Sequence, residues 1–258
     1  MAVMTRFGFV LALCLAATSS AADLHLVWSD EFDGPQGAAP DSKKWTYDLG
    51  SNGWGNRELE NYTNRRDNSF LDGEGHLVIR ALKENGGYTS ARLKTSGLYA
   101  FAYGKVAARI KLPKGQGIWP AFWMLGDDEK TVGWPKCGEI DIMEFIGKLP
   151  STVHFTIHGP GYSGGKAIGK AVDLPERDAF HTYGLEWEPD KLVFLLDDQP
   201  VRTLTPADLP AGTKSVYDHP HFLLLNLAVG GAWPGNPDQT TVFPQDYVID
   251  WVRVWQRE

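Results

Sequence analysis

The stretch Trp134–Gly147 reads W-P-K-C-G-E-I-D-I-M-E-F-I-G and places three carboxylates, Glu139, Asp141 and Glu144, among apolar residues. Its β-branched and aromatic residues favour a β-strand, in which successive side chains point to opposite faces. Glu139 and Asp141 therefore share one face, whereas strict alternation would turn Glu144 to the other. One extra residue, a β-bulge, would bring Glu144 back, and bulges are common beside active sites. We therefore predict three acids on one face of one strand.

Three neighbouring carboxyl groups suit acid–base chemistry. Like charges at short distance raise the pKa of at least one carboxyl, which leaves a proton donor beside an ionised neighbour. Such a pair is the machinery of glycoside hydrolysis, and a separation of about 5–5.5 Å lets one group act as a nucleophile with retention of configuration. The alternative is an acidic sheet face that is solvated or binds a cation. The apolar interleaving and the nearby tryptophans favour catalysis.

The segment G-E-I-D-I-M-E-F-I-G resembles the active-site strand of glycoside hydrolase family 16. Its E-x-D-x-x-E spacing is similar to the laminarinase-type branch rather than to the E-x-D-x-E of the lichenase type. The resemblance runs from the W-S-D-E-F motif at Trp28 to D-Y-V-I-D-W-V-R-V-W near the C-terminus. It implies an all-β fold, a two-sheet jelly-roll β-sandwich that is concanavalin-like, with an open cleft on the concave sheet.

The resemblance also implies a role for each acid. Glu139 is expected to be the nucleophile that forms a glycosyl-enzyme intermediate, Glu144 the acid and then the base, and Asp141 the residue that tunes both pKa values. The implied activity is that of an endo-acting, retaining β-glucanase that cuts internal β-1,3 bonds of laminarin-like glucans. Mixed-linkage β-1,3-1,4-glucan is a further candidate substrate. The two carboxyl groups supply the chemistry, so no cofactor is expected for catalysis.

Residues 1–22 are predicted to be a signal peptide, with a positive Arg6, an apolar run over Phe7–Ala17 and a small-residue cleavage site at Ser20–Ala22. Residues 23–258 are predicted to form a single catalytic domain, because short apolar runs separated by Gly, Pro, Asn and Asp recur along them. Cys137 is then the only cysteine, so no intramolecular disulfide is expected. We expect a secreted or periplasmic monomer that is free of the membrane once the signal is removed.

The composition restricts the class of partner. The formal net charge is −7, whereas a nucleic-acid partner would call for basic patches. This charge also fits a neutral polymer better than an acidic one such as carrageenan. The chain has 10 Trp, 9 Tyr and 12 Phe, most of which should be core. A tryptophan on an open sheet face, however, offers a flat apolar surface to a sugar ring.

Two strand segments carry candidate substrate-binding residues. In G-I-W-P-A-F-W, Trp119 and Trp123 fall on one face by the period of a strand. Periodicity alone leaves both open as core residues, but the segment resembles the family motif whose tryptophans flank the scissile sugar. A strand histidine is more often structural than catalytic. The T-I-H-G segment nevertheless resembles the one whose histidine faces the acid/base carboxylate, which favours His158 over His154.

Loops and an edge strand add four more candidates for substrate binding. Gly50–Asn64 is rich in Gly and Asn and is predicted to be a loop; the resemblance assigns its Trp54 and Asn56 to the non-reducing side of the cleft. G-G-A-W-P-G resembles a cleft loop in which Trp233 forms a wall. Alternation in H-L-V-I-R allows Arg80 to reach the cleft. Solvated positions remain the alternative for Trp54, Asn56 and Arg80.

A structural calcium on the convex side is also implied by the resemblance. The matching groups are Glu31, Gly75 and Asp250, partly through backbone oxygens. Oxygen ligands of this kind suit calcium. An Asp250 that is paired or solvated without a metal ion remains the alternative.

Two other functions stay open at this point. One is a family-16 hydrolase that acts on lichenan, agarose or carrageenan. The E-x-D-x-x-E spacing argues against the first, and the W-P-A-F-W and H-G-P-G-Y-S-G segments look more laminarinase-like than agarase-like. The other is a non-catalytic β-glucan-binding module on the same sandwich. Such relatives typically lack the catalytic glutamates, whereas this chain keeps all three acids.

Overall fold

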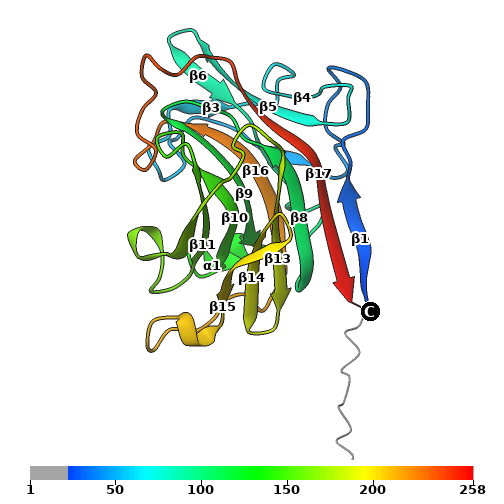
Figure 1. Ribbon diagram of the computed structural model, residues 1–258, viewed down its shortest axis with the longest axis vertical. Coiled ribbons are helices and arrows are strands. Elements are labelled where there is room, and N and C mark those ends of the chain that lie inside the picture. The colour runs from blue at the N-terminus through cyan, green and yellow to red at the C-terminus, as the bar shows by residue number, and fades with distance from the viewer. Residues whose placement is uncertain (1–22, 258) are drawn as a thin grey trace, which may run out of the picture.

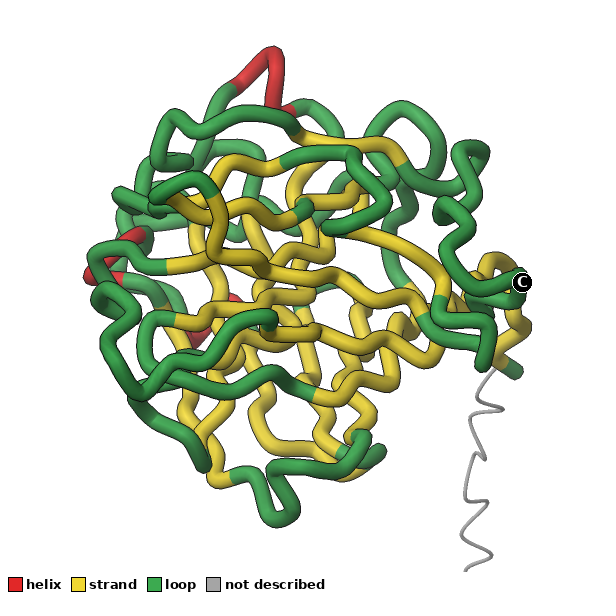
Figure 2. The backbone as a smooth tube through the Cα atoms, turned by 90° about the horizontal axis from the view of Figure 1, so that it is seen from above, coloured by secondary structure: helices red, strands yellow, loops and turns green. Residues whose placement is uncertain are grey.

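The computed structural model describes residues 23–257, so the predicted signal peptide lies outside the described residues. The chain forms two large β-sheets joined by loops and a few short helical turns (Figures 1 and 2). In the described residues the helical segments are α1 (Glu129–Val132) and the 3₁₀ turns η1 (Gly164–Lys166) and η2 (Pro206–Asp208). The predicted two-sheet, all-β architecture is therefore confirmed.

The larger sheet has ten strands. Its order is β15 (Gln199–Leu204), β14 (Lys191–Leu196), β13 (His181–Glu188), β8 (Gly104–Lys111), β17 (Gln245–Arg257), β5 (Leu77–Glu84), β6 (Gly87–Ser90) and β3 (Glu60–Tyr62). Two further strands join its edges, β1 (Leu24–Asp30) on β17 and β4 (Ser69–Leu71) on β5. All of its pairings are antiparallel except that of β3 with β6.

The smaller sheet has seven strands. Its order is β12 (Ile168–Asp173), β11 (Thr152–His158), β10 (Glu139–Phe145), β9 (Ile118–Gly126), β16 (His221–Val229), β7 (Arg92–Lys94) and β2 (Thr46–Asp48). The strand with the three acids, β10, is thus flanked on both sides by long strands, which hold its backbone firmly in the sheet.

One hydrophobic core fills the space between the two sheets. Val106, Ala108 and Ile110 of β8 enter it from the larger sheet, and Phe122 and Met124 of β9 enter it from the smaller one. Alternate residues of β8 thus face the core, with the period of two that is typical of a strand. The other face of the smaller sheet points away from this core.

The predicted bulge is present in β10. The ladder with β11 pairs Asp141 with Thr156 and Glu144 with His154, so two residues of β10 stand opposite one of β11. The two intervening residues of β10 are both fully buried in the core. Because both of them point inward, Glu144 returns to the face that Glu139 and Asp141 occupy.

The segment Gly50–Asn64, predicted as a loop, contains strand β3. This short strand pairs in parallel with β6, and the Glu60 carboxylate accepts a hydrogen bond from the Val229 backbone N–H at 2.6 Å. The strand is therefore stabilised by contacts with distant segments. Its sequence, E-N-Y, has too little apolar alternation to indicate a strand by itself.

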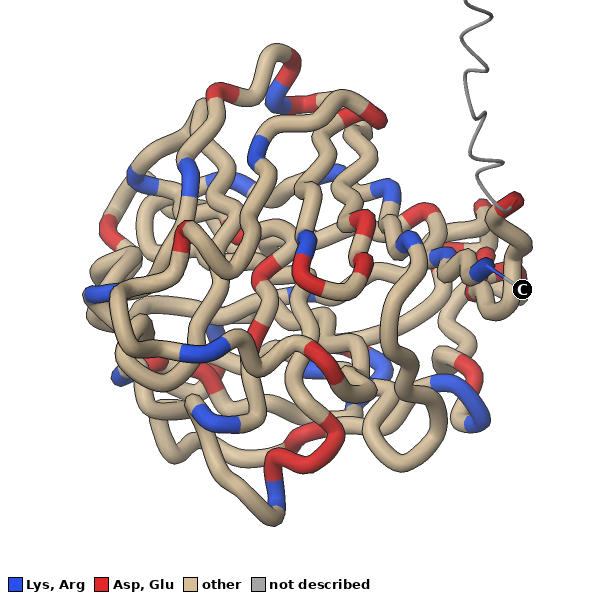
Figure 3. The backbone as a smooth tube through the Cα atoms, turned by 90° about the horizontal axis from the view of Figure 1, so that it is seen from below, with Lys and Arg blue, Asp and Glu red and all other residues tan. Residues whose placement is uncertain are grey.

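Charged residues lie along much of the described chain, and its cysteine is unpaired. Lysine, arginine and acidic residues are interspersed along the backbone (Figure 3). Cys137 is a free, buried cysteine. No helix among residues 23–257 is long and apolar enough to cross a bilayer.

The core position beneath the bulge gives a first prediction. Phe122 pairs with the bulge residue Met143 and is fully buried. Phe122→Ala should lower the free energy of unfolding by about 3–5 kcal/mol, because it removes a large core side chain and leaves a cavity. Chemical denaturation measures the change. The matched control is Val242→Ala, whose side chain is 72% exposed; a similar loss in both variants would contradict this account of the core.

Candidate active site

The outer face of the smaller sheet around Glu139, Asp141 and Glu144 is here called the carboxylate face. These three side chains lie on β10 opposite residues of β11, with Glu139 facing His158 and Glu144 facing His154. Directly opposed residues on antiparallel strands have Cβ atoms about 4.5–5.5 Å apart. Each terminal acid of the motif is therefore within reach of a histidine on the next strand.

His158 contacts the first two acids. Its Nε2 lies 3.1 Å from Asp141 Oδ2 and 3.7 Å from Glu139 Oε1. The Gly164 backbone N–H donates to His158 Nδ1 at 3.1 Å. In the neutral ring one nitrogen accepts and the other carries the proton, so this bond assigns the proton to Nε2, where it faces the carboxylates. The other oxygen of Glu139, Oε2, accepts a hydrogen bond from Trp134 Nε1 at 2.7 Å.

Aromatic side chains surround the third acid. Trp119 Nε1 donates to Glu144 Oε1 at 3.1 Å. The Trp233 ring stands edge to face against Trp119, with centroids 5.4 Å apart, and against His154 at 4.9 Å. Trp119, Trp233 and His158, predicted separately from distant segments, therefore lie together around the acids.

The three acids differ in how strongly they hold a proton. Burial is the largest cause that raises the pKa of each. The charges of Asp141 and Glu139 raise the pKa of Glu144 further, to well above its ordinary value. Burial and then the charge of Asp141 raise the pKa of Glu139 to about 8, while His158, the Trp134 N–H and Arg92 limit the rise. Glu144 therefore keeps its proton to a higher pH and is available as the acid, and Glu139 is the more readily ionised glutamate.

A chain of hydrogen bonds connects two predicted substrate-binding residues, Trp123 and Asn56. Trp123 Nε1 donates to Asn226 Oδ1 at 2.8 Å, and Asn226 Nδ2 donates to Tyr62 OH at 3.1 Å. Tyr62 OH then donates to Glu58 Oε2 at 3.0 Å, and Asn56 Nδ2 donates to Glu58 Oε1 at 2.9 Å. Asn226 is the polar residue of the otherwise apolar F-L-L-L-N-L-A-V strand, and no sequence pattern indicates its partners.

Arg92 is a site residue that sequence reasoning missed. Its guanidinium carbon lies 4.8 Å from the ring centroid of Trp54 and 4.8 Å from that of Trp123. It also pairs with Asp48, with Nε and Oδ2 3.0 Å apart. A weak signal was available, because R-L-K alternates around the buried Leu93 and so turns Arg92 away from the core.

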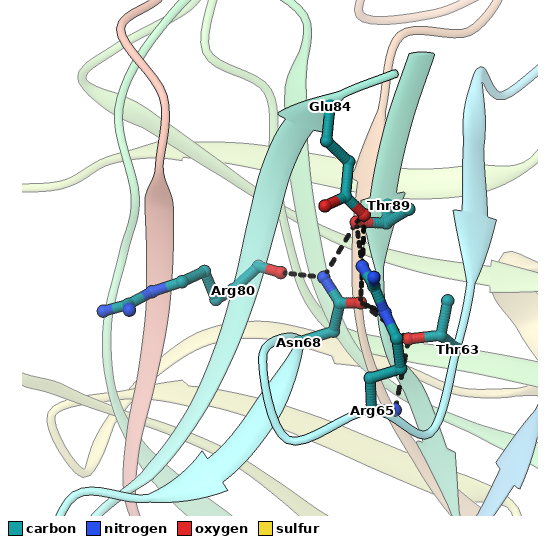
Figure 4. Close-up of polar contacts among 6 residues, drawn as sticks. All are labelled: Thr63, Arg65, Asn68, Arg80, Glu84 and Thr89. Atoms are coloured by element: carbon teal, nitrogen blue, oxygen red, sulfur yellow. Dashed lines mark hydrogen bonds and ion pairs between the residues drawn. The ribbon is translucent and has the colours of Figure 1, made fainter. Parts of the chain in front are cut away.

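The structure does not bring Arg80 to the carboxylate face. Arg80 lies in β5 of the larger sheet, and its Nε and second terminal nitrogen each donate to Asp246 at 2.7 Å. The side chain extends toward β17, while its carbonyl accepts from Asn68 (Figure 4). Alternation correctly turned Arg80 away from Leu77 and Ile79 in the core, but that direction leads to the outer face of the other sheet.

The residues predicted for calcium lie in or next to the strands at one edge of β17, where its ladder partner changes from β5 to β1. Glu31 follows β1, Gly75 precedes β5, and Asp250 lies in β17 between the two pairings. Arg253 pairs with Glu31 at 2.7 Å, and Arg109 pairs with Asp250. Both carboxylates thus have a cationic partner, and backbone oxygens are the remaining donors of the predicted set.

Among residues 23–257, two groups of side chains place potential cation ligands within 4.8 Å of one another. One is Asp72, Glu74 and His76, in the turn before β5; the Asp72 carboxylate there accepts backbone N–H groups of the same turn. The second comprises Glu139, Asp141 and His158. Their closeness follows from the acid–base arrangement described above, which needs no cation.

Comparison with known proteins places this arrangement among carbohydrate-active enzymes. Residues 56–253 match the family described as "Glycosyl hydrolases family 16". The chain is 40% identical to a β-glucanase from Rhodothermus marinus, over 98% of this chain and 95% of that protein. The endo-β-1,3-glucanase of Pyrococcus furiosus has a similar structure, with 47% identity, a TM-score of 0.86 and coverage of 93% of this chain and 97% of that one. The laminarinase catalytic domain of Thermotoga maritima is 46% identical, with a TM-score of 0.84 and coverage of 92% of this chain and 99% of that one.

Burial of Glu144 gives a prediction about stability. Its folded-state pKa is raised, so the stability tied to its proton is complete below the ordinary pKa, about 4.3, and is lost as the pH rises toward the folded value. Glutamine stays neutral throughout. Glu144→Gln should therefore abolish turnover and raise the melting temperature at pH 7, by about 2–4 °C for each kcal/mol gained.

Calorimetry at pH 7 and at about pH 4, near the ordinary glutamate pKa, checks the sign. The difference from wild type should shrink at the lower pH, where the unfolded state also binds the proton. The control is Glu176→Gln, at an exposed position, which should leave the melting temperature unchanged. A lower melting temperature for Glu144→Gln at pH 7 would contradict the raised pKa.

Proposed function

Because this chain belongs to glycosyl hydrolase family 16, we propose that it is a retaining endo-β-1,3-glucanase that cuts internal bonds of laminarin-like glucans. The observation that carries the proposal is the bulge in β10, which sets Glu139, Asp141 and Glu144 on one sheet face. Similar proteins named endo-1,3-β-glucanase or laminarinase match nearly the whole chain at 46–47% identity, and they support β-1,3-glucan as the substrate.

In the first step the ionised Glu139 carboxylate attacks the anomeric carbon of the sugar. A bond forms between the carboxylate oxygen and that carbon, and the bond from the carbon to the glycosidic oxygen breaks. Glu144 gives its proton to the departing oxygen, which leaves as the hydroxyl of the shortened glucan. The high pKa of Glu144 supports its role as this acid.

In the second step Glu144, now a carboxylate, takes a proton from water. The water oxygen attacks the anomeric carbon, and the ester bond to Glu139 breaks to return the nucleophile as a carboxylate. Two displacements retain the anomeric configuration. Asp141, with His158 Nε2 3.1 Å away, supplies a charge that raises the pKa of both glutamates.

Tryptophans and polar side chains on the same face are proposed to bind the polymer. Trp119 donates to Glu144 and packs against Trp233. Trp123 and Trp54 both pack against Arg92. A flat indole face suits the apolar face of a pyranose ring. Asn56, an exposed side chain held through Glu58, is proposed to hydrogen-bond a sugar hydroxyl.

The proposed organisation has an exported single catalytic domain. Residues 1–22 are proposed to be a signal peptide and residues 23–258 the catalytic domain, which acts as a secreted or periplasmic monomer. The family match over residues 56–253 lies inside the proposed domain and supports its placement.

A structural calcium at the edge of β17 is also part of the proposal. Glu31, Gly75 and Asp250 lie where three strands meet, and carbonyl and carboxylate oxygens are the ligands that calcium prefers. The donor set fits in part, because Arg253 and Arg109 pair with the two carboxylates. The ion would supply a tie between β1, β5 and β17 on the sheet opposite the acids.

Reducing-end release from laminarin, mixed-linkage β-glucan, agarose and carrageenan tests the function. Laminarin should be cut fastest, with mixed-linkage glucan second. Glu139→Gln should abolish release while glucan binding and the melting transition persist, because the amide is not a nucleophile. Glu176→Gln is the control that should keep full activity.

Each outcome of this test has a distinct meaning. Cleavage of a galactan alone would overturn the substrate but keep the acids. Binding of glucan without cleavage by the folded wild type would favour a recognition module. Wild-type-like activity of Glu139→Gln would exclude Glu139 as the nucleophile.

The calcium proposal predicts a stability effect apart from catalysis. Adding calcium to the chelator-treated protein should raise the melting temperature, because a hundredfold excess over Kd adds about 2.7 kcal/mol to the free energy of unfolding. Asp250→Asn should abolish the rise while keeping activity at low temperature. A melting temperature that does not respond to calcium or chelator would refute the site.

A further inference from the structure

Trp134 makes a contact with Glu139 that no sequence pattern assigned to it. Its side chain is 49% exposed, yet its Nε1 donates to Glu139 Oε2 at 2.7 Å. The ring also lies beside His158, with centroids 6.0 Å apart and planes inclined by 45°. An exposed indole whose only polar atom is directed at a reacting carboxylate needs an explanation other than core packing.

The loop that carries Trp134 is held at its ends by hydrogen bonds. It connects β9 to β10, and the Gly126 N–H donates to the Gly138 carbonyl at 3.2 Å. The Asp127 N–H donates to the Pro220 carbonyl at 2.9 Å. The loop is therefore closed at its base, and its start is tied to the segment before β16.

Packing next to β10 fixes the same loop. Cys137 is fully buried in a cluster with Leu125, Phe222 and Leu224. Gly138 has φ of 72° and lies so close to the Val216 carbonyl that a Cβ would approach its oxygen to 2.9 Å. Glycine alone adopts this conformation readily, so Gly138 and the buried Cys137 fix the backbone directly before Glu139. The indole is presented to the carboxylate by a fixed support.

We propose that Trp134 is a catalytic residue whose indole N–H holds one oxygen of the nucleophile Glu139 throughout the reaction. This inference rests on the proposed function, in which Glu139 forms and then releases a glycosyl ester. The Glu139 charge is consumed when the ester forms and returns when the ester breaks. A donor on the carboxylate oxygen stabilises that returning charge, so it favours departure of Glu139 in the second step.

The two glutamates have matching partners of the same chemical kind. Trp134 donates to Glu139, and Trp119 donates to Glu144 at 3.1 Å. The charged groups that act on Glu139 are Asp141, Glu144, His158 and Arg92, and the Cys137 thiol and Tyr217 hydroxyl, whose pKa values burial raises, also interact with it. These stay in place when an indole is replaced by a phenyl ring, so a change in titration can be assigned to the lost N–H.

Trp134→Phe is the decisive variant, because it keeps an aromatic ring and removes the donor. The acidic limb of kcat/KM for laminarin reports ionisation of the nucleophile in the free enzyme. A donor to the ionised form lowers its pKa, so the limb should move to higher pH in the variant. At the pH optimum kcat/KM should fall roughly tenfold to a hundredfold, as for loss of a hydrogen bond to a charged group.

Two further tryptophans serve as controls with opposite expectations. Trp119→Phe should move the basic limb to higher pH, because it removes a donor from Glu144, and should leave the acidic limb in place. Trp123→Phe removes an N–H that bonds the neutral Asn226 amide; it should weaken substrate binding without moving either limb. Thermal melts of all three variants check that they fold.

The results separate three situations. A shifted acidic limb in Trp134→Phe alone supports the proposal. An unmoved limb overturns it, whether kcat/KM is unchanged or merely reduced by a misplaced loop. Mass spectrometry with an activated 2-deoxy-2-fluoro-glucoside tests the premise separately: labelling of Glu139 in the wild type upholds the proposed function, and labelling elsewhere refutes the function and the role of Trp134 together.

Discussion

The two inward-pointing residues in β10 determine most of what this protein can do. A regular strand would bury Glu144 in the core or expose core residues, whereas the bulge satisfies both faces at once. Ile142 and Met143 fill the space between the sheets, and Glu144 rejoins Glu139 and Asp141 outside. The long ladders with β9 and β11 hold this irregular strand in place. The chemistry therefore depends on a local departure from alternation that only a well-ordered sheet can support.

Placing three acids on a half-buried sheet face opposes stability. No lysine or arginine forms an ion pair with any of the three within the described chain, and desolvation raises every pKa. The neighbours are instead neutral donors, namely the two indoles, and a histidine. Such partners bias the ionisation of each carboxyl without neutralising it. The large core and the two sheets stabilise the fold and so offset the unfavourable burial of these acids.

The sequence could predict what depends on neighbouring residues. The spacing E-x-D-x-x-E was enough to predict the bulge, and period-two patterns placed Trp119 and Trp123 on one face. Arg80 shows the limit of that reasoning, because alternation gives the side of a strand but not the sheet to which the strand belongs. Arg92 and Trp134 were missed for a related reason. Their roles arise from contacts between segments distant in sequence, or across a loop whose path no periodicity encodes.

The hydrogen bonds from Trp123 to Asn56 have a consequence for how this site can evolve. Five side chains from three separate segments share one continuous set of donors and acceptors, and three of them, Asn226, Tyr62 and Glu58, are buried. An exchange at either end leaves an unmatched polar atom further along the chain. Two parts of the sugar-binding surface are thus genetically coupled, and changes in substrate preference there would arise through paired rather than single substitutions.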